Sequence, residues 1–471
     1  MATPRTRGIY CNRTLNMRAI RAIGYDMDYT LIHYHVEVWE RRAYEYAQES
    51  LVARGFPVGH LRFDKGLVDR GLILDVAEGN LVKADRFGYI RAAAHGTRML
   101  PFTELREKYG RTFIDLRDPR WVFLSTLFDI SLACLYGQTV DLLDDGRLEG
   151  PKGYLELYRL VRSGLDAAHV EGRLKDEIIK DPSAYVDLDE DVPKALLDQK
   201  LAGKKLMLIT NSEWHYTHAM MSYAFDPFLP EGTRWRDLFD IVIVQARKPA
   251  FFVDVSTPLF EVINDEGHLR PVVGPPRAGG TYLGGHARLV ETALGLADLD
   301  VLYVGDHIFS DVNVSKSSVR WRTALILREL EAEIEAMDAF AASERELSAL
   351  MADKAVIEVD VAQLRLDLQR QRAGLRPVTE GRRSAEIEHE IEQKKAVLRS
   401  FDERISPLAE QYSRLHNPRW GPVMRAGIDK SHMARQVERY ADVYTSRVGN
   451  FLYATPNVYL RSPKSSLPHD G

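Results

Sequence analysis

The sequence predicts an α/β protein with a parallel central sheet, a mixed insertion and a long helical hairpin. Three observations lead to this fold class. Four short apolar runs carry few alternating polar residues, as buried parallel strands do, and helical patterns lie between them. The stretch between the first two runs is too long for a single crossover connection. A later segment carries apolar residues at alternating spacings of four and three, which indicates paired helices.

Each of the four apolar runs ends in polar residues that could take part in chemistry. The runs cover residues 19–25, 204–209, 240–246 and 300–305. In open α/β sheets, ligands bind outside the carboxyl ends of the strands. The residues that follow the runs are therefore expected at one edge of the sheet: Asp26 and Asp28 after the first, Thr210, Asn211 and Ser212 after the second, Lys248 after the third, and Asp306 and Asp311 after the fourth.

The same runs divide the chain into a core and an insertion. Residues 1–50 and 196–327 are expected to form the two parts of a Rossmann-like core. Residues 51–195 are expected to form a mixed α/β cap that is inserted between them. Within this cap, turn signals between short strand candidates predict a β-meander, and a helical pattern follows; the strand candidates are 71–77, 81–85 and 89–94, and the helix is 154–163.

Residues 328–416 predict a helical hairpin arm, and residues 417–471 are expected to pack on the core. The second half of the arm carries a heptad seam that only Lys394 interrupts, and Pro407 is expected to kink or end the second helix. A hairpin that packs on its own domain and an oligomer interface explain the pattern equally well. The apolar seam positions are Leu347, Leu350, Ile357, Val361, Leu364 and Leu368 in the first half, and Ile387, Ile391, Leu398, Phe401, Ile405, Leu408, Tyr412 and Leu415 in the second.

Composition excludes several classes of protein. The chain has 471 residues, and its 63 basic and 68 acidic side chains nearly balance, which argues against a binder of nucleic acid polymers. Two cysteines cannot build a disulfide framework. Neither a signal-like apolar segment near the N-terminus nor an apolar stretch long enough for a membrane span is present in the sequence. A soluble, cytoplasmic protein without membrane partners is therefore expected.

Asp26 and Asp28 form the first candidate site. Side chains at positions i and i+2 of an extended segment point the same way, so both carboxylates would face one ligand. Such a pair can divide into an ionised nucleophile and a proton-carrying general acid, or it can bind a divalent cation. Taken alone, the motif is also compatible with a turn or a helix cap.

The other three clusters also have plain alternatives when each is taken alone. Residues 210–212 offer hydroxyl and N–H groups for an oxyanion, but they also suit a helix N-cap. Lys248 suits a phosphate group, but most lysines are simply exposed. Asp306 and Asp311 suit Mg²⁺, a hard ion that prefers oxygen ligands. The ordered combination of all four clusters is far more specific than any one of them.

In this order the clusters resemble the haloacid-dehalogenase-like phosphohydrolases. The resemblance implies that Asp26 attacks phosphorus to form an aspartyl-phosphate, and that Asp28 serves as general acid and then as general base. It also implies that Thr210 and Lys248 hold the phosphoryl oxygens. The Mg²⁺ ligands that it implies are Asp26, the backbone carbonyl of Asp28, Asp306 and, through water, Asp311.

The resemblance can be narrowed to one family. YDMDYTL at 25–31 and YVGDHIFSDV at 303–312 look like the cytosolic purine 5′-nucleotidases, the type II enzymes that prefer IMP and GMP. ITNSEWHYT at 209–217 and ARKPAFF at 246–252 agree, and the resemblance runs from about residue 12 to residue 469. It therefore covers nearly the whole chain.

The resemblance implies that the insertion recognises the nucleotide. Phe128 matches an aromatic residue that stacks on the purine, and Lys175 matches a phosphate contact. An arginine and an aspartate four residues apart can read the 6-oxo group and N1–H of hypoxanthine or guanine. Without the resemblance, a surface ion pair and a core phenylalanine would be the plainer interpretations. The implied base-reading residues are Arg162, Asp166 and His169.

Asp129 departs from the family pattern. Animal members carry an amide there that helps to bind the base, and an ionised carboxylate cannot donate a hydrogen bond. This position therefore bears on base selectivity. Phe123 and Ser125 also differ from the animal residues near the effector site around Phe309, so nucleotide activation is not predicted.

The sequence thus predicts a Mg²⁺-dependent 5′-nucleotidase that hydrolyses purine nucleoside 5′-monophosphates, IMP and GMP first, with a nucleoside phosphotransferase side activity. One alternative is a phosphatase of the same superfamily for another phosphomonoester, such as a sugar phosphate. Another is a non-catalytic nucleotide-binding scaffold that assembles through the arm. A homo-oligomer, either a dimer or a tetramer, is expected.

Overall fold

The computed structural model describes residues 3–170, 172–376 and 382–464, without the side chains of 167–170. The chain divides into two compact units. The first unit comprises Met1–Glu331 and Val423–Gly471, and the second comprises Ala332–Pro422. The insertion 51–195 lies within the first unit, so its separation from the core as a cap domain stays a prediction.

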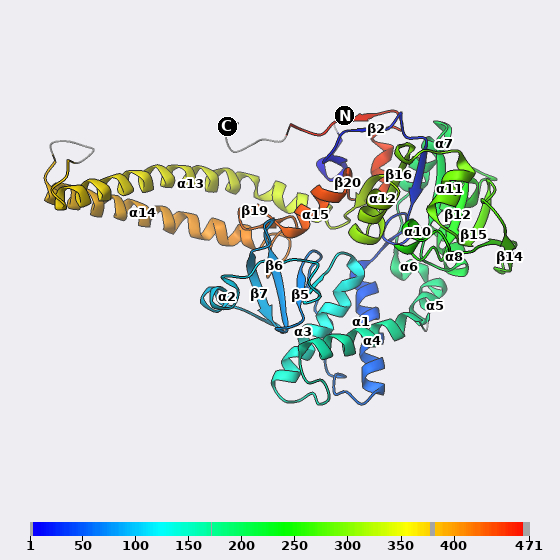
Figure 1. Ribbon diagram of the computed structural model, residues 1–471, viewed down its shortest axis with the longest axis horizontal. Coiled ribbons are helices and arrows are strands. Elements are labelled where there is room, and N and C mark those ends of the chain that lie inside the picture. The colour runs from blue at the N-terminus through cyan, green and yellow to red at the C-terminus, as the bar shows by residue number, and fades with distance from the viewer. Residues whose placement is uncertain (1–2, 171, 377–381, 465–471) are drawn as a thin grey trace. The chain divides into compact units, whose positions relative to one another are not determined.

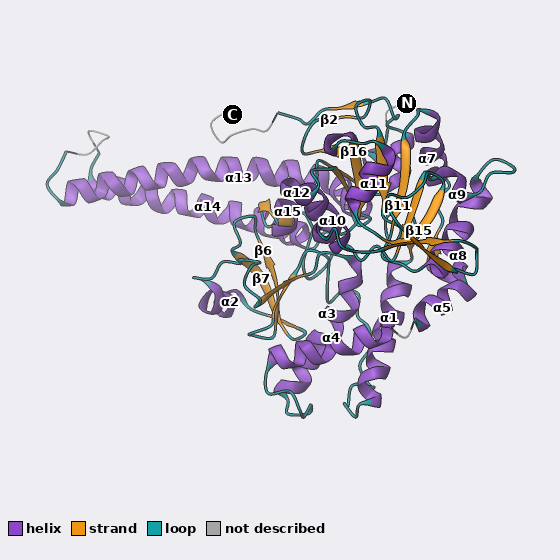
Figure 2. Cartoon of the chain, turned by 45° about the vertical axis from the view of Figure 1, so that its right-hand side comes forward, coloured by secondary structure: helices purple, strands orange, loops and turns teal. Residues whose placement is uncertain are grey.

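A mostly parallel sheet of ten strands forms the centre of the first unit, which confirms the predicted α/β class. All four predicted runs are strands of this sheet, and they lie next to one another in the order β16, β3, β11, β12. Figure 2 shows β16, β11 and β15 within this sheet. In spatial order the strands are β1 (Tyr10–Cys11), β20 (Val443–Thr445), β17 (Arg322–Ile326), β16 (Val301–Gly305), β3 (Ala22–Tyr25), β11 (Lys205–Ile209), β12 (Ile241–Val244), β15 (Gly280–Gly284), β13 (Leu259–Val262) and β14 (Leu269–Val272).

Pairing is parallel from β20 to β15 and antiparallel only at the two edges of the sheet. The central strands β3, β12 and β16 are buried along their whole length because both faces of the sheet are covered there. Their buried side chains, including Met207, Ile243 and Tyr303, pack with Phe251, Phe252 and Trp321 from the connecting segments. This core fixes the carboxyl ends of four neighbouring strands relative to one another, and the polar clusters follow at those ends.

Helices and short turns connect these strands within the first unit. The helices are α1 (Val36–Ala53), α5 (Arg173–Lys180), α6 (Pro182–Tyr185), α7 (Asp191–Leu201), α8 (Trp214–Phe225), α9 (Trp235–Leu238), α10 (Ala250–Val253), α11 (Ala287–Leu294), α12 (Val314–Ser318) and α15 (His432–Tyr440), and η1 (Arg5–Arg7), η3 (Asp226–Phe228), η4 (Asp298–Asp300), η5 (Ile308–Asn313) and η6 (Val448–Leu452) are single turns. Three small antiparallel pairs join β4 (His33–Tyr34) to β10 (Val186–Asp187), β18 (Arg425–Ala426) to β19 (Asp429–Lys430), and β2 (Leu15–Asn16) to β21 (Tyr459–Leu460).

The insertion contains a second, antiparallel sheet in the order β8, β7, β6, β5, β9 (Figure 1). Three of its strands coincide with the predicted meander candidates. They are packed by a separate apolar cluster that includes Ile73, Val82 and Trp121. Besides α5, α6 and β10, named above, the elements of the insertion are β5 (Ile73–Asp75), β6 (Asn80–Ala84), β7 (Ile90–His95), β8 (Arg98–Met99), α2 (Phe102–Tyr109), β9 (Trp121–Phe123), η2 (Leu127–Asp129), α3 (Ile130–Asp144) and α4 (Tyr154–Val170).

The second unit contains two long helices, α13 (Leu330–Arg372) and α14 (Ser384–Ser413), which lie side by side in Figure 1. The helices are antiparallel, because Lys354 pairs with Asp402 at 2.6 Å and Arg372 pairs with Glu388 at 2.6 Å. Their shared core consists of predicted seam residues: Ile357, Val361, Leu364, Leu368, Ile387, Ile391 and Leu398.

Of the two outcomes expected at Pro407, a kink or the end of the second helix, the end is wrong. Helix α14 continues past Pro407 to Ser413. A proline removes only one backbone N–H from the helical hydrogen bonds, and the last turn beyond it can still form its own. At Lys394, the break in the apolar seam is an ion pair of 2.8 Å with Asp360 across the hairpin. Within the described ranges, none of the helices combines the length and the apolar character of a membrane span.

Candidate active site

Two of the polar clusters meet because the sheet continues for one residue beyond β3 and β11. The N–H of Asp26 donates to the carbonyl of Val304 at 2.9 Å, and the N–H of Thr210 donates to the carbonyl of Ile243 at 2.9 Å. The main chain of these residues is therefore held in register with the neighbouring strands. The strand-end placement that was expected from the sequence has this geometric basis.

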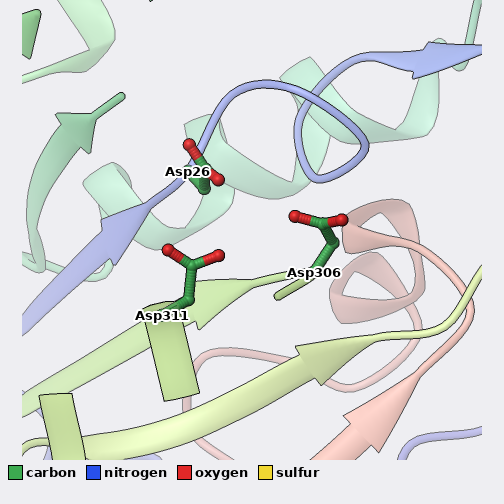
Figure 3. Close-up of side chains that lie close together, drawn as sticks. All are labelled: Asp26, Asp306 and Asp311. Atoms are coloured by element: carbon green, nitrogen blue, oxygen red, sulfur yellow. The ribbon is translucent and has the colours of Figure 1, made fainter. Parts of the chain in front are cut away.

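Three carboxylates converge at this edge of the sheet. Asp26, Asp306 and Asp311 point toward one another (Figure 3), and each offers an oxygen that lies within 4.8 Å of the other two. Asp306 and Asp311 are almost fully buried. Three carboxylates so close together repel one another, and a hard divalent cation with oxygen ligands compensates that charge. The residues therefore fit a Mg²⁺-type ion.

Close packing beneath Asp311 keeps its carboxylate in this cluster. Gly305 ends β16, and Asp311 lies on the π-helical turn η5 that follows. A Cβ atom added at Gly305 would lie 2.5 Å from Asp311 Oδ2. Only glycine leaves room for this approach, and the N–H of His307 donates to the same Oδ2 at 3.2 Å. Gly305 is thus a residue of the site. It lies within the motif at 303–312, but its residue type predicted no role for it.

Lys248 lies inside the carboxylate cluster. Its Nζ is 2.7 Å from Asp26 Oδ1 and 2.8 Å from Asp311 Oδ1, and it donates to the Tyr303 hydroxyl at 3.1 Å. Only 2% of the side chain is exposed, so this lysine is far from the surface position that lysines usually take. Tyr303 was not predicted, because inside an apolar strand it is indistinguishable from a core residue.

Asn211 holds the loop that carries Lys248. Its Oδ1 accepts from the backbone N–H of Lys248 at 2.6 Å, and its Nδ2 donates to the carbonyl of the same residue at 3.1 Å. The sequence predicted Asn211 as a phosphate contact. In the structure its amide is instead used on the Lys248 backbone, so it acts on the site through Lys248.

The charges in the cluster shift one another's pKa values. Burial raises the pKa of Asp26 well above its usual range, Asp311 and Asp306 add to the rise, and Lys248 opposes it. Burial and the neighbouring Asp311 raise the pKa of Asp306 to about 7, against the cations Arg70 and Lys248. For Lys248, burial opposes the charged form, but Asp26 and Asp311 prevail and hold its pKa well above the usual value.

Asp28 is held by hydroxyl groups on both carboxylate oxygens. Tyr34 donates to Oδ1 at 2.5 Å, and Ser212 donates to Oδ2 at 2.7 Å. The Tyr34 hydroxyl is also 3.0 Å from the hydroxyl of Tyr216 on α8. Asp28 is less buried than Asp26. The sequence predicted Asp28 and Ser212 as site residues but neither tyrosine. Tyr34 lies 6 positions and Tyr216 lies 188 positions after Asp28, and no sequence pattern relates residues at these separations.

Lys175 reaches this group from α5. Its Nζ donates to Ser212 Oγ at 3.1 Å and to Glu213 Oε2 at 2.8 Å. Lys175 was predicted as a phosphate contact, and the structure brings it beside residues 210–212. Thr210 is fully buried, and its Oγ1 accepts from the N–H of Ser212 at 3.0 Å.

The predicted base-reading residues lie on the insertion, and the structure describes four of the five. Phe128 packs edge-on against Tyr29 at 4.7 Å and against Trp39 at 5.5 Å between ring centroids. Arg162 pairs with Asp166 at 3.4 Å, which is the surface ion pair that the spacing alone suggested. The side chain of His169 lies outside the described residues.

Asp129 has a structural task of its own. Its Oδ2 accepts from the N–H of Ser125 at 3.0 Å and from the N–H of Thr126 at 3.3 Å. Burial raises its pKa to about 6, while Thr126 and the nearby Arg162 counteract the rise. The carboxylate therefore fixes the turn before α3, a use that an amide oxygen would serve as well.

Taken together, the site combines Asp28, held on both carboxylate oxygens, with a buried lysine and a carboxylate cluster at the carboxyl edge of a parallel sheet. Comparison with known proteins gives the family. The chain belongs to the 5′ nucleotidase family, whose model matches residues 9–471. This membership confirms the resemblance drawn from the sequence motifs, and it implies a phosphomonoester hydrolase.

Relatives of known sequence carry the same family name. The chain is 31% identical to 5′-nucleotidase domain-containing protein 1 of Bos taurus, over 68% of this chain and 74% of that protein. It is 27% identical to 5′-nucleotidase domain-containing protein 2 of Homo sapiens, over 98% and 85%. A 5′-nucleotidase domain-containing protein of Dictyostelium discoideum is 26% identical over 98% and 74%.

One solved structure, an archaeal β-phosphoglucomutase from Pyrococcus sp. strain ST 04, aligns with 65% of this chain and 86% of its own. The TM-score of this alignment is 0.30 and the sequence identity is 11%.

Proposed function

We propose that this protein is a Mg²⁺-dependent 5′-nucleotidase that hydrolyses purine nucleoside 5′-monophosphates, IMP and GMP first. The observation that carries the proposal is the placement of Lys248 between Asp26 and Asp311, beside an Asp28 that is held on both oxygens. An attacking carboxylate and a phosphate dianion repel each other, so catalysis needs positive charge at this point. Family membership supports the phosphomonoester class of substrate.

The first step forms an aspartyl-phosphate. A carboxylate oxygen of Asp26 attacks phosphorus, the bond from phosphorus to the 5′-oxygen breaks, and a proton from Asp28 goes to the leaving oxygen. In this step Lys248 and Thr210 hold the phosphoryl oxygens. Bound by Asp26, Asp306 and the backbone carbonyl of Asp28, with Asp311 close by, Mg²⁺ would supply Lewis-acid stabilisation of the phosphoryl charge.

The second step hydrolyses the aspartyl-phosphate and regenerates the free enzyme. Asp28, now ionised, takes a proton from water, the water oxygen attacks phosphorus, and the bond to Asp26 breaks to release phosphate. Tyr34 and Ser212 keep Asp28 in place for both steps. When a nucleoside hydroxyl takes the place of water, the phosphoryl group is transferred instead, which is the proposed phosphotransferase activity.

The test is phosphate release from a substrate panel with and without Mg²⁺. IMP and GMP are expected to be better substrates than AMP or a sugar phosphate, and Mg²⁺ removal is expected to abolish release. Asp26→Asn should be inactive, whereas Asp265→Asn, at a carboxylate that is 70% exposed, should not change the rate.

The panel also separates the alternatives. Equal rates for IMP, AMP and a sugar phosphate would contradict the proposed base recognition and favour a general phosphatase. An inactive native protein in the presence of Mg²⁺ would favour a non-catalytic nucleotide-binding scaffold. Asp166→Ala should reduce the preference for IMP over AMP more than it reduces the rate with an aryl phosphate, because the aryl phosphate has no purine to read. The homo-oligomeric state and the cytoplasmic location stay predictions.

A further inference from the structure

The insertion touches the carboxylate cluster directly, through one short segment. Thr126 Oγ1 donates to Asp306 Oδ2 at 3.2 Å. One residue earlier, Ser125 Oγ lies 3.4 Å from Nε2 of His307, the neighbour of Asp306. Thr126 and Asp306 are both nearly inaccessible to solvent, so water cannot replace this contact easily. A hydroxyl of the insertion therefore orients one of the three carboxylates.

Arg70 makes a second bridge between the same two segments. Its Nε donates to the carbonyl of Ser125 at 3.0 Å, and its Nη2 donates to the carbonyl of Asp306. The guanidinium is buried and paired with Glu329 at 3.2 Å. A buried arginine that is fixed in this way has little freedom to move, because each N–H that loses its partner costs free energy. The Ser125–Thr126 backbone and the Asp306 backbone are thus held as one block.

The other end of the segment carries the residues proposed to meet the base. Only Leu127 separates Thr126 from Phe128 and Asp129, and Asp129 Oδ2 accepts from the N–H groups of both Ser125 and Thr126. Because of this tight turn, Phe128 and Thr126 have little freedom to move relative to each other. A ligand that orders Phe128 and Asp129 therefore also orders the hydroxyl that holds Asp306.

We propose that Thr126 is a positioning residue that couples occupancy of the base site to the affinity of the carboxylate cluster for its metal ion. The coupling half of this inference rests on the proposed function, since it needs a purine at Phe128. The positioning half rests only on the contact between Thr126 and Asp306. Groups that orient a metal ligand typically change metal affinity by about 10–100-fold when they are removed.

The first experiment measures Mn²⁺ binding to the full chain without substrate, by electron paramagnetic resonance. Thr126→Val removes the hydroxyl at nearly constant shape and is expected to weaken Mn²⁺ binding about tenfold. Thr126→Ser keeps the hydroxyl and should stay within about twofold of wild type. Thr139→Val is the matched control, because Thr139 is buried in α3 and donates to the Tyr136 carbonyl at 2.8 Å. Equal Mn²⁺ affinity in Thr126→Val and wild type would overturn the positioning role.

The second experiment measures the coupling with inosine, which carries the base but has no phosphate to touch the metal. Saturating inosine is expected to tighten Mn²⁺ binding to wild type by about fivefold, and Mn²⁺ must tighten inosine binding by the same factor. In Thr126→Val the factor should fall to about one. A factor of one in wild type, with inosine binding seen by calorimetry, would overturn the coupling.

The two experiments distinguish failure of this inference from failure of the proposed function. Absence of inosine binding to wild type would contradict the purine site and the coupling with it, while the tenfold effect of Thr126→Val on Mn²⁺ would still support the positioning role. Purine nucleotide hydrolysis together with an unchanged Mn²⁺ affinity in Thr126→Val would leave the function standing and overturn the inference.

Discussion

Asp28 receives one hydroxyl hydrogen bond on each carboxylate oxygen, and the shorter comes from Tyr34 at 2.5 Å. A general acid works only when its proton points at the leaving oxygen, so these two contacts set the direction of Asp28. Tyr216 in turn holds the Tyr34 hydroxyl at 3.0 Å. In the proposed mechanism, the efficiency of Asp28 as a general acid therefore depends on the hydroxyl of Tyr34, which holds one of its carboxylate oxygens.

Tyr34→Phe is expected to slow leaving-group release from IMP about tenfold in single-turnover measurements, with little change in KM. Release of p-nitrophenol from p-nitrophenyl phosphate should slow much less, because that leaving group needs no proton. Tyr46→Phe is the control, since Tyr46 donates to Glu177 at 2.6 Å rather than to Asp28. An equal loss with both substrates, or a rise in KM alone, would contradict this role.

Glu40 is another buried carboxyl group, besides those of the carboxylate cluster, and its pKa lies far from its usual range. Its Oε2 accepts from the N–H of Ser131 in the first turn of α3 at 2.9 Å. Burial raises its pKa to about 8, despite this hydrogen bond. The folded protein thus keeps the proton on Glu40 up to about pH 8, while an unfolded chain releases it near ~4.3.

Unfolding therefore releases a proton between these two pH values, and the free energy of unfolding falls as pH rises through that window. Glu40→Gln keeps the acceptor for Ser131 but cannot ionise. The variant should match wild type near pH 5 and should be more stable at pH 9, by on the order of 3 kcal/mol. Urea unfolding at the two pH values checks this, and an equal difference at both would show that Glu40 is not the titrating group.

At the scale of elements, the helical hairpin of the second unit shows how far periodicity alone can place a residue. Leu364 and Leu366 are two positions apart on α13, so they point to opposite sides of the helix. Leu364 is 6% exposed in the core shared with α14, whereas Leu366 is 40% exposed. Two leucines within one helical turn are therefore expected to contribute differently to the stability of the hairpin.

Leu364→Ala should destabilise the hairpin by about 2–4 kcal/mol, because it removes buried methyl groups and leaves a cavity. Leu366→Ala should change stability by less than about 1 kcal/mol. Hydrogen exchange of the amides in α13 and α14 measures both, since local opening reports the stability of this unit. Similar protection in the two variants would contradict the assignment of the seam.

The sequence was most informative where one element carries an uninterrupted pattern. The strand around Ile243 and the seam around Leu364 could be placed because burial on both faces, or on one stripe, leaves a direct trace in residue type. β15 contains Gly280 and Gly284, and β20 is only three residues long, so neither carries enough apolar pattern to be found. Their place in the sheet is set by tertiary pairing, with β12 and β17 respectively.

At the scale of the whole molecule, the pattern of apolar runs predicted only the strand-end residues of the candidate site, and Lys175 was found only through the family resemblance. Asp26, Lys248 and Asp306 follow apolar runs, so a general rule of α/β sheets placed them. Thr126 and Arg70 reach the same cluster from the insertion, 100 and 44 positions from Asp26. No local pattern encodes such a contact, since it depends on how the insertion folds back on the sheet. The supporting residues of the site are therefore the part that needed the structure.

The carboxylate cluster also makes a prediction for the stability of the whole chain. Asp26, Asp306 and Asp311 share one buried lysine, so negative charge is in excess at the cluster whenever all three carboxyl groups are ionised. A cation that binds only the folded state stabilises it by mass action, by about 2.7 kcal/mol at a hundred times its dissociation constant. Mg²⁺ should therefore raise the melting temperature of wild type by a few degrees over the protein in EDTA.

Asp306→Asn removes one of the repelling carboxylates, and it should lose most of the Mg²⁺-dependent rise without a lower melting temperature in EDTA. Asp265→Asn, at an exposed carboxylate, should keep the full rise. Sodium chloride at the same ionic strength separates specific binding from screening of surface charge. An equal rise in wild type and Asp306→Asn, or a rise that sodium chloride reproduces, would place the ion elsewhere than among these carboxylates. Because the readout is unfolding, it tests the metal site even in a protein preparation for which no substrate has been found.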